Sequence, residues 1–171
     1  MTTSPIFLNR CIQKNGISQS IHNIDSINVP DKNCHIAKDK GGNNYLDHLY
    51  YVSNRMRTRE GKIAGLLHDI MEDSKCSFQE LENARVPVES MRVIDILTRR
   101  ENETYRKYIN RIIESNNILA IKIKIIDLEN NMDLSRIPNY TKTDKNRVYK
   151  RYLPAYLTLL RSLEKVLSKC Q

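Results

Sequence analysis

Residues 62–74 read Lys-Ile-Ala-Gly-Leu-Leu-His-Asp-Ile-Met-Glu-Asp-Ser, an apolar helical run that ends in one histidine and three acids. His68, Asp69, Glu72 and Asp73 fall within two helical turns. Burying so much negative charge on one helix is costly unless a cation or a polar site compensates it. A divalent metal ion is the simplest compensation, so this stretch predicts a metal site in a helical fold.

The composition is that of a folded protein with a preference for anionic partners. The 171 residues suit one domain with a single core, and 40% of them are hydrophobic. The formal net charge of +8 favours a nucleotide, a nucleic acid or another polyphosphate, although basic surfaces without such a role are common. The sequence shows neither a signal-peptide pattern nor an apolar stretch of about 20 residues, the length of a membrane span. We therefore expect a cytoplasmic protein that does not associate with membranes.

Long amphipathic stretches, interrupted by only five glycines and five prolines, predict an all-α protein folded as a single compact helical bundle. Residues 121–126 alternate as a strand would, but the apolar stretch 118–132 is too long for a typical strand and favours a central helix. Pro154 should kink or split the last helix. Helices are expected at residues 45–56, 60–72, 87–97, 103–114, 118–132 and 144–170, with a short one after the Ser77-x-x-Glu80 capping box.

Four side chains from three separated segments are candidate ligands for one ion: His48, His68, Asp69 and Asp127. Two imidazoles and two carboxylates suit manganese, iron, magnesium or zinc and leave positions for water and substrate. Neighbouring helix residues diverge by about 100°, so His68 and Asp69 can share an ion only where their rotamers converge on it. The cores of helical bundles are places where such sites are built.

Two further acids are candidate catalytic residues. Glu72 follows Asp69 by three positions on the same helix face, and Asp73 lies one step around the helix. A carboxylate that reaches the attacking water without binding the metal is what general acid or base catalysis of hydrolysis requires.

Each of these residues also has an ordinary interpretation when it is taken alone. A histidine such as His48 is usually a packed or surface residue, and the two acids after Asp69 could form a solvated helix end. Asp127 could simply pair with Lys124 or Arg136. The joint spacing favours the metal site over these separate explanations.

The order His48, His68-Asp69, Asp127 resembles the HD phosphohydrolase superfamily, whose members are all-helical and metal-dependent. Compact bacterial and phage-borne small alarmone hydrolases are similar at residues 97–109 and 131–136 as well. The resemblance is identified over roughly residues 39–139, so we expect an HD-type domain at 39–171 and a divergent segment at 1–38 that packs on it. A closer resemblance, to the hydrolase half of the RelA/SpoT proteins and to the small alarmone hydrolases, rests on Lys40-Gly-Gly-x-x-Tyr45-x-x-His48, Leu66-Leu67-His68-Asp69-x-x-Glu72-Asp73 and Lys124-Ile-Ile-Asp127-Leu-x-x-Asn131-Met132.

The resemblance implies a reaction that removes pyrophosphate from the 3′ position of guanosine tetra- or pentaphosphate. It assigns metal binding, with manganese the usual ion, to the four candidate ligands, and the handling of the hydrolytic water to Glu72 and Asp73. Lys40 and Tyr45 would lie in the loop that forms the base pocket, and Asn131 would contact the sugar. The implied substrate-binding residues are Lys40, Tyr45, Lys124 and Asn131.

Two alternatives stay open. Asp39 stands where the family often has arginine, so the substrate could be another nucleotide: a nucleoside monophosphate, a cyclic nucleotide or NADPH. The protein could also be a non-catalytic module that binds a nucleotide or RNA, because basic residues alternate with tyrosines at residues 145–152, although such a stripe is usually a solvated helix face.

For partners we expect an anionic nucleotide rather than a nucleic acid. By analogy with the family, a homo-oligomer and an alarmone-making toxin to which the protein would be the antidote are further hypotheses.

Overall fold

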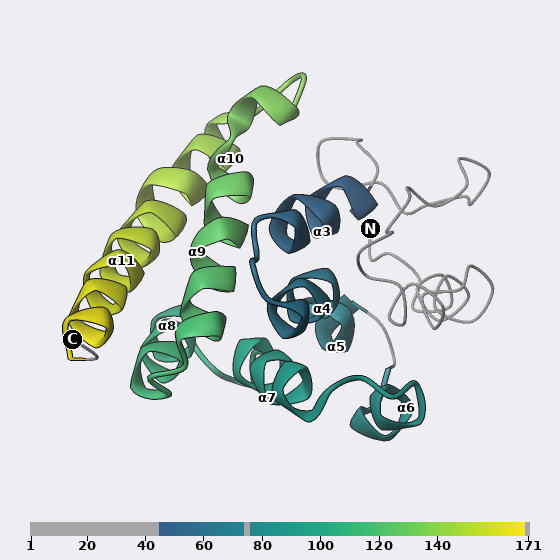
Figure 1. Ribbon diagram of the computed structural model, residues 1–171. Coiled ribbons are helices and arrows are strands. Elements are labelled where there is room, and N and C mark those ends of the chain that lie inside the picture. Colours follow the sequence, from purple (N-terminus) through teal and green to yellow (C-terminus); the bar gives the residue numbers. More distant parts are fainter. Residues whose placement is uncertain (1–44, 74–75, 170–171) are drawn as a thin grey trace.

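Helix α9 (Ile118–Met132) is the centre of the computed structural model, which describes residues 45–73 and 76–169 (Figure 1). The side chain of Asn117 caps its start by accepting the N–H of Ala120. Ile121, Ile123 and Ile125 are all buried, because other helices cover α9 on several sides. The prediction of a central helix is therefore confirmed, and the alternating isoleucines are buried on more than one side of it, although Lys122 is exposed. Its neighbours are α3 (Tyr45–Asn54), α4 (Arg59–Leu67), α7 (Val88–Leu97), α8 (Tyr105–Glu114) and α11 (Leu153–Ser168).

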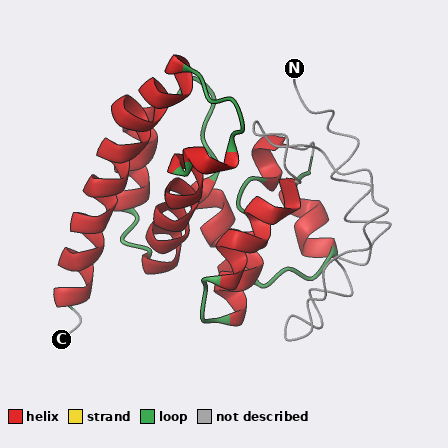
Figure 2. Cartoon of the chain, turned by 90° about the horizontal axis from the view of Figure 1, so that it is seen from above, coloured by secondary structure: helices red, strands yellow, loops and turns green. Residues whose placement is uncertain are grey.

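The described part of the chain is all-α and contains no strand (Figure 2), as the sequence predicts. The Ser77–Glu80 capping box forms as expected and starts α6. A second capping box, Thr141 with Asp144, starts α10. The shorter elements are α5 (Ile70–Asp73), α6 (Phe78–Asn83), a 3₁₀ turn (Leu134–Arg136), α10 (Lys142–Arg147) and a π-helical turn (Val148–Tyr152).

Apolar side chains from α3, α4 and α7 meet those of α8, α9 and α11 in one large core. The removal of such side chains from water is the main stabilising contribution to a fold of this kind. Asp127 lies on the same helix as the most buried isoleucines and is itself only 2% exposed. A carboxylate at that depth requires charged or hydrogen-bonding partners. The fully buried members include Val52, Ile63, Val93, Ile94, Ile112, Ile121, Ile123, Leu128 and Leu159.

The helix expected at residues 60–72 is interrupted at its most informative point, so that prediction was wrong in one respect. Helix α4 ends at Leu67, His68 is its C-cap, and α5 begins at Ile70. The carbonyl of Asp69 accepts the N–H groups of Glu72 and Asp73 and so starts the new helix. His68 and Asp69, which a continuous helix would hold about 100° apart, thus lie in a turn, and each contributes a ligand atom to one cluster.

The expected interruption of the last helix takes the form of a π-helical turn. Residues 142–168 are helical throughout, and the N–H of Leu153 reaches back to the carbonyl of Val148. Pro154 follows directly, in the first turn of α11. Proline has no N–H to donate, and the wider turn directly before it accommodates this without breaking the helix.

The packing of residues 1–38 and the role of Lys40 lie outside the described residues. None of the described helices combines the length and the apolar character needed to cross a bilayer.

Candidate metal centre

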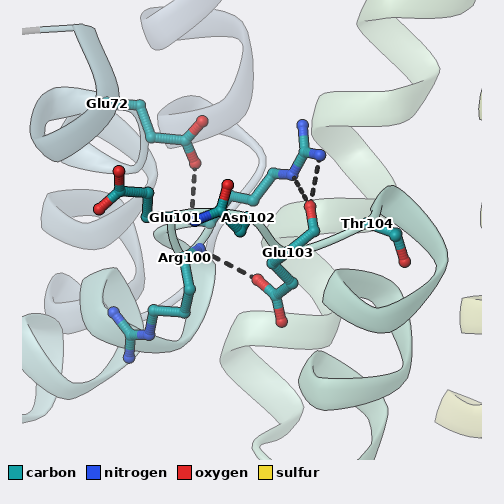
Figure 3. A pocket seen from close by; sticks show the side chains of 7 residues that line it. Glu72, Arg100, Glu101, Asn102, Glu103 and Thr104 are labelled. Carbon is teal, nitrogen blue, oxygen red and sulfur yellow. Dashed lines mark hydrogen bonds between the residues drawn. The ribbon is translucent and has the colours of Figure 1, made fainter.

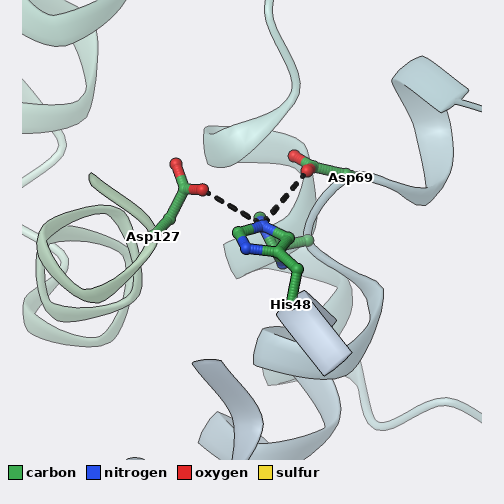
Figure 4. A group of neighbouring side chains, drawn as sticks. His48, Asp69 and Asp127 are labelled. Atoms are coloured by element: carbon green, nitrogen blue, oxygen red, sulfur yellow. Dashed lines mark ion pairs between the residues drawn. The ribbon is translucent and has the colours of Figure 1, made fainter. Parts of the chain in front are cut away.

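The four candidate ligands come together at the junction of α3, α4, α5 and α9. Figure 4 shows three of them, His48, Asp69 and Asp127. Each offers one ligand atom, and these four atoms all lie within 4.8 Å of one another. Nε2 of His48 is 3.3 Å from Oδ1 of Asp127, and Nε2 of His68 is 3.2 Å from Oδ2 of Asp69. His48, His68 and Asp127 are buried, whereas the side chain of Asp69 is 30% exposed. The cluster thus has three buried members and one that faces solvent, and metal binding by it stays a prediction.

Both imidazole rings are held by their outer nitrogen atoms. Nδ1 of His48 lies 2.7 Å from Oδ1 of Asn130, and Nδ1 of His68 lies 2.8 Å from the carbonyl of Gly65. Because both oxygens are acceptors, each Nδ1 donates a hydrogen and each Nε2 presents a lone pair to the cluster. Nε2 of His68 is buried, and the carboxylates of Asp69 and Asp127 lie near it. A buried lone pair that faces carboxylates fits a cation in the cluster.

Asn130 was not among the predicted site residues, yet it orients a candidate ligand. It lies three positions after Asp127 and therefore on the same face of α9. Its side-chain oxygen also accepts from the guanidinium of Arg136, which fixes the amide with its oxygen toward His48. The spacing from Asp127 was the signal in the sequence that could have identified it.

Gly65 allows α3 and α4 to approach closely enough for His48 and His68 to meet. A Cβ atom at Gly65 would lie 3.1 Å from Cα and 3.2 Å from N of Ser53 on α3. These are backbone atoms, so neither can move aside without shifting the helix. The same residue supplies the carbonyl that holds His68.

Lys124 is the counter-charge of Asp127. Its ammonium is 2.8 Å from Oδ2 of Asp127, and Asn131 donates a hydrogen bond to Oδ1 of the same carboxylate. Burial alone would raise the pKa of Asp127, but Lys124 and the two imidazoles outweigh burial and hold that pKa well below its usual value. The ion pair with Lys124, which the sequence suggested as an alternative role for Asp127, is present. Asp127 forms this pair while it also belongs to the cluster of candidate ligands.

The carboxylates make the cluster attractive to positive charge. Burial disfavours a charged His68, but Asp69 and Asp127 outweigh it and raise the pKa of His68 to about 10. The two carboxylates thus favour a proton, or another positive charge, at Nε2. A divalent ion would displace that proton, as metal ions do when they bind histidine.

The two candidate catalytic acids flank the cluster and have separate partners. Oε1 of Glu72 accepts the backbone N–H of Arg99 at 2.8 Å. The hydroxyl of Tyr45 donates to Oδ2 of Asp73 and lies 3.4 Å from Oδ2 of Asp69. Burial is the main cause that raises the pKa of both Glu72 and Asp73. Both carboxyl groups thus hold a proton more readily than an exposed acid does.

Comparisons with known proteins point to one kind of fold. No protein-family model and no curated protein sequence matches the chain. A solved structure does match: a metazoan ortholog of SpoT, described as hydrolysing ppGpp and acting in starvation responses, superposes with a TM-score of 0.57. The chain therefore shares the all-helical fold of that structure. The identity is 21%, and the match covers 79% of this chain and 86% of the other.

Glu72 also borders an open cavity of about 660 Å³ (Figure 3). The rest of its lining is the stretch Arg99–Thr104, between α7 and α8. This stretch was not among the predicted site residues, although it lies inside the 97–109 segment that resembles the compact family members. The structure therefore adds a wall beside Glu72 that combines basic and acidic side chains.

Proposed function

We propose that the protein is a metal-dependent phosphohydrolase that removes pyrophosphate from the 3′ position of guanosine tetra- or pentaphosphate and releases GDP or GTP. One observation carries the proposal. Two imidazole nitrogens and two carboxylate oxygens converge within 4.8 Å, and the buried Nε2 of His68 faces the two carboxylates without a hydrogen bond from any other described residue. The fold shared with a ppGpp hydrolase and the two adjacent acids support the same reaction.

The residues present fit a divalent cation, for which we propose manganese. His48, His68, Asp69 and Asp127 would hold it through a mixed set of nitrogen and oxygen atoms. When bound, such an ion lowers the pKa of water and neutralises charge on a phosphoryl oxygen. The hydrogen bonds from the outer nitrogens of the two histidines keep both rings in the required tautomer.

The neighbouring side chains would handle protons and charge. Glu72, whose raised pKa suits a proton acceptor, would take the proton of the attacking water, and the Arg99 N–H holds its carboxylate in place. Asp73 would also accept a proton from the attacking water, while its Oδ2 accepts a hydrogen bond from the hydroxyl of Tyr45. Lys124 would neutralise negative charge of the substrate close to the cluster.

The formal net charge of +8 supports a substrate with many negative charges. Tyr45 and Lys124 both lie beside the cluster, consistent with the substrate-binding roles proposed for them. For Asn131, the proposed contact with the sugar would be made from a side chain that also steadies Asp127.

The test is a nucleotide panel with the purified protein and manganese, in which pyrophosphate and phosphate are measured separately. We expect pyrophosphate from guanosine tetraphosphate. Asp127→Asn should abolish its release, whereas Asp47→Asn, at an exposed position of α3, should not. Release of phosphate from another nucleotide would favour the second substrate class, and binding without any product would favour a non-catalytic module.

A further inference from the structure

The α7–α8 loop, defined here as residues 98–104, is tied down by a single side chain from α8. Arg111 donates from Nη1 to the carbonyl of Ile96 at 2.9 Å and from Nη2 to the carbonyl of Thr98 at 2.9 Å. It also holds the carboxylate of Glu103 through Nε at 2.8 Å and Nη2 at 3.0 Å. Arg111 thus joins the end of α7, the start of the loop and the end of the loop.

This geometry requires a guanidinium group. The carbonyls of Ile96 and Thr98 lie at the end of α7, where carbonyls have no partner within the helix. The planar fork of arginine can serve them while it binds a carboxylate with two parallel hydrogen bonds. The side chain of Glu103 is only 10% exposed in this pair and that of Arg111 is 29% exposed. Lysine, with one nitrogen, cannot make the same set of bonds.

The loop is folded back on itself around Glu103. Its carboxylate accepts the N–H of Arg100 at 3.0 Å, and its carbonyl accepts the guanidinium of Arg99, with Nε at 2.8 Å. Asn102 closes the turn in the left-handed region, with φ of 59°, which asparagine tolerates better than most residues. The backbone at residues 99 and 100 is therefore held by Arg111 at the preceding residue, Thr98, and by Glu103 at the following turn.

The fixed backbone is the part of the loop that meets Glu72. The N–H of Arg99 donates to Oε1 of Glu72 at 2.8 Å, directly after the Thr98 carbonyl that Arg111 holds (Figure 3). Arg111 itself does not line the cavity, and its hydrogen bonds go to Ile96, Thr98 and Glu103 rather than to Glu72. Its influence on Glu72 runs through the loop.

We infer that Arg111 is a positioning residue for Glu72: it clamps the α7–α8 loop so that the Arg99 N–H sets the direction of the Glu72 carboxylate. The inference rests on the proposed role of Glu72 as the proton acceptor in hydrolysis. A misplacement of about 1 Å of a reacting group can lower a rate by about 100-fold. The clamp therefore affects turnover more than substrate binding.

The kinetic test compares Arg111→Met, Arg111→Lys and a matched control, Arg92→Met, which breaks an exposed ion pair on α7. We expect Arg111→Met to lower kcat by about 10- to 100-fold and to change KM by less than about threefold. Arg111→Lys should recover only part of the loss, and Arg92→Met should behave as the wild type. In a Glu72→Ala background, Arg111→Met should lower kcat no further, because the group through which it acts is gone. An additive loss there, or a loss confined to KM, would overturn the inference.

A second measurement does not depend on activity. The amide proton of Arg99, observed by NMR, should shift in Glu72→Ala, because its carboxylate acceptor is removed. Arg111→Met should shift it in the same direction, and Arg92→Met should leave it in place. An unchanged Arg99 amide in folded Arg111→Met would overturn the inference even for an active enzyme. Conversely, a wild type that hydrolyses no nucleotide would refute the proposed function, while the amide shifts would still decide whether Arg111 sets the position of Glu72.

Discussion

At the scale of single residues, the candidate metal centre depends on what holds the two histidines from behind. Asn130 and the carbonyl of Gly65 each accept a hydrogen bond from an Nδ1 and so leave Nε2 free. Partners of this kind orient a ligand and raise its basicity without touching the ion. Their removal should therefore weaken metal binding while the four candidate ligands stay in place.

Asn130→Ala tests this directly. Loss of the acceptor at Nδ1 should let the ring of His48 rotate and change tautomer, which we expect to weaken manganese binding by about 10- to 100-fold. Isothermal titration calorimetry with manganese measures the effect. Asn110→Ala, at an exposed position of α8, is the control and should bind as the wild type. Equal affinity in Asn130→Ala and the wild type would show that Asn130 plays no such part.

Gly65→Ala tests the close approach of α3 and α4. The added Cβ would press on backbone atoms of Ser53 at 3.1 and 3.2 Å, which should destabilise the protein by about 1–2 kcal/mol even though alanine favours helices. Gly61→Ala is the matched control on the same helix, because its Cβ would meet side-chain atoms of Thr58 and Met56 instead. Urea unfolding should show the larger loss for Gly65→Ala. The opposite order would mean that α3 can move away from α4 at little cost.

At the scale of elements, the sequence predicts those helix bounds that are set by capping residues and by the local apolar pattern. The bounds of α9 agree with the expected 118–132, because Asn117 caps one end and the apolar pattern stops at Met132. The break between α4 and α5 could not be predicted in this way, since the pattern through residue 72 is helical. It arises where His68 and Asp69 must face one centre, which is a tertiary requirement. The clamp by Arg111 is likewise hidden, because Ile96, Thr98 and Glu103 share no sequence pattern with it.

The link between α7 and α8 has a predictable pH dependence. The hydrogen bonds from Arg111 hold the pKa of Glu103 at about 2, below its ordinary 4.5. Between these values the unfolded chain binds more protons than the folded protein, so this contribution to stability is complete above pH 4.5 and is lost as the pH falls toward 2. Glu103→Gln should therefore cost about 1 kcal/mol of unfolding free energy at pH 7. Urea unfolding of both proteins from pH 7 to 3 should show their difference shrinking below pH 4.5; a constant difference would argue against the pair.

At the scale of the whole molecule, the candidate metal centre joins parts of the chain that sequence places far apart. His48 comes from α3, His68 and Asp69 from the turn after α4, and Asp127 from the central helix. The sequence identifies these side chains by type and order, but only packing around α9 shows that they meet. Two carboxylates held this close repel each other unless a positive charge lies between them. A bound ion should therefore stabilise the arrangement of three helices and not only the site.

If an ion binds at the candidate metal centre, the thermal stability of the protein should depend on the metal concentration. An ion that binds only the folded protein adds about 2.7 kcal/mol at 100 times its dissociation constant. For a chain of this size each kcal/mol raises Tm by about 2–4 °C, so manganese should raise Tm by about 5–10 °C over protein treated with EDTA. Thermal unfolding followed by circular dichroism, at rising manganese concentrations, measures the shift. Asp127→Asn keeps the shape of the side chain but removes a charged ligand, and should lose most of the shift. A shift that persists in this variant would place the stabilising ion elsewhere, because Asp127 is the carboxylate that the central helix contributes to the cluster.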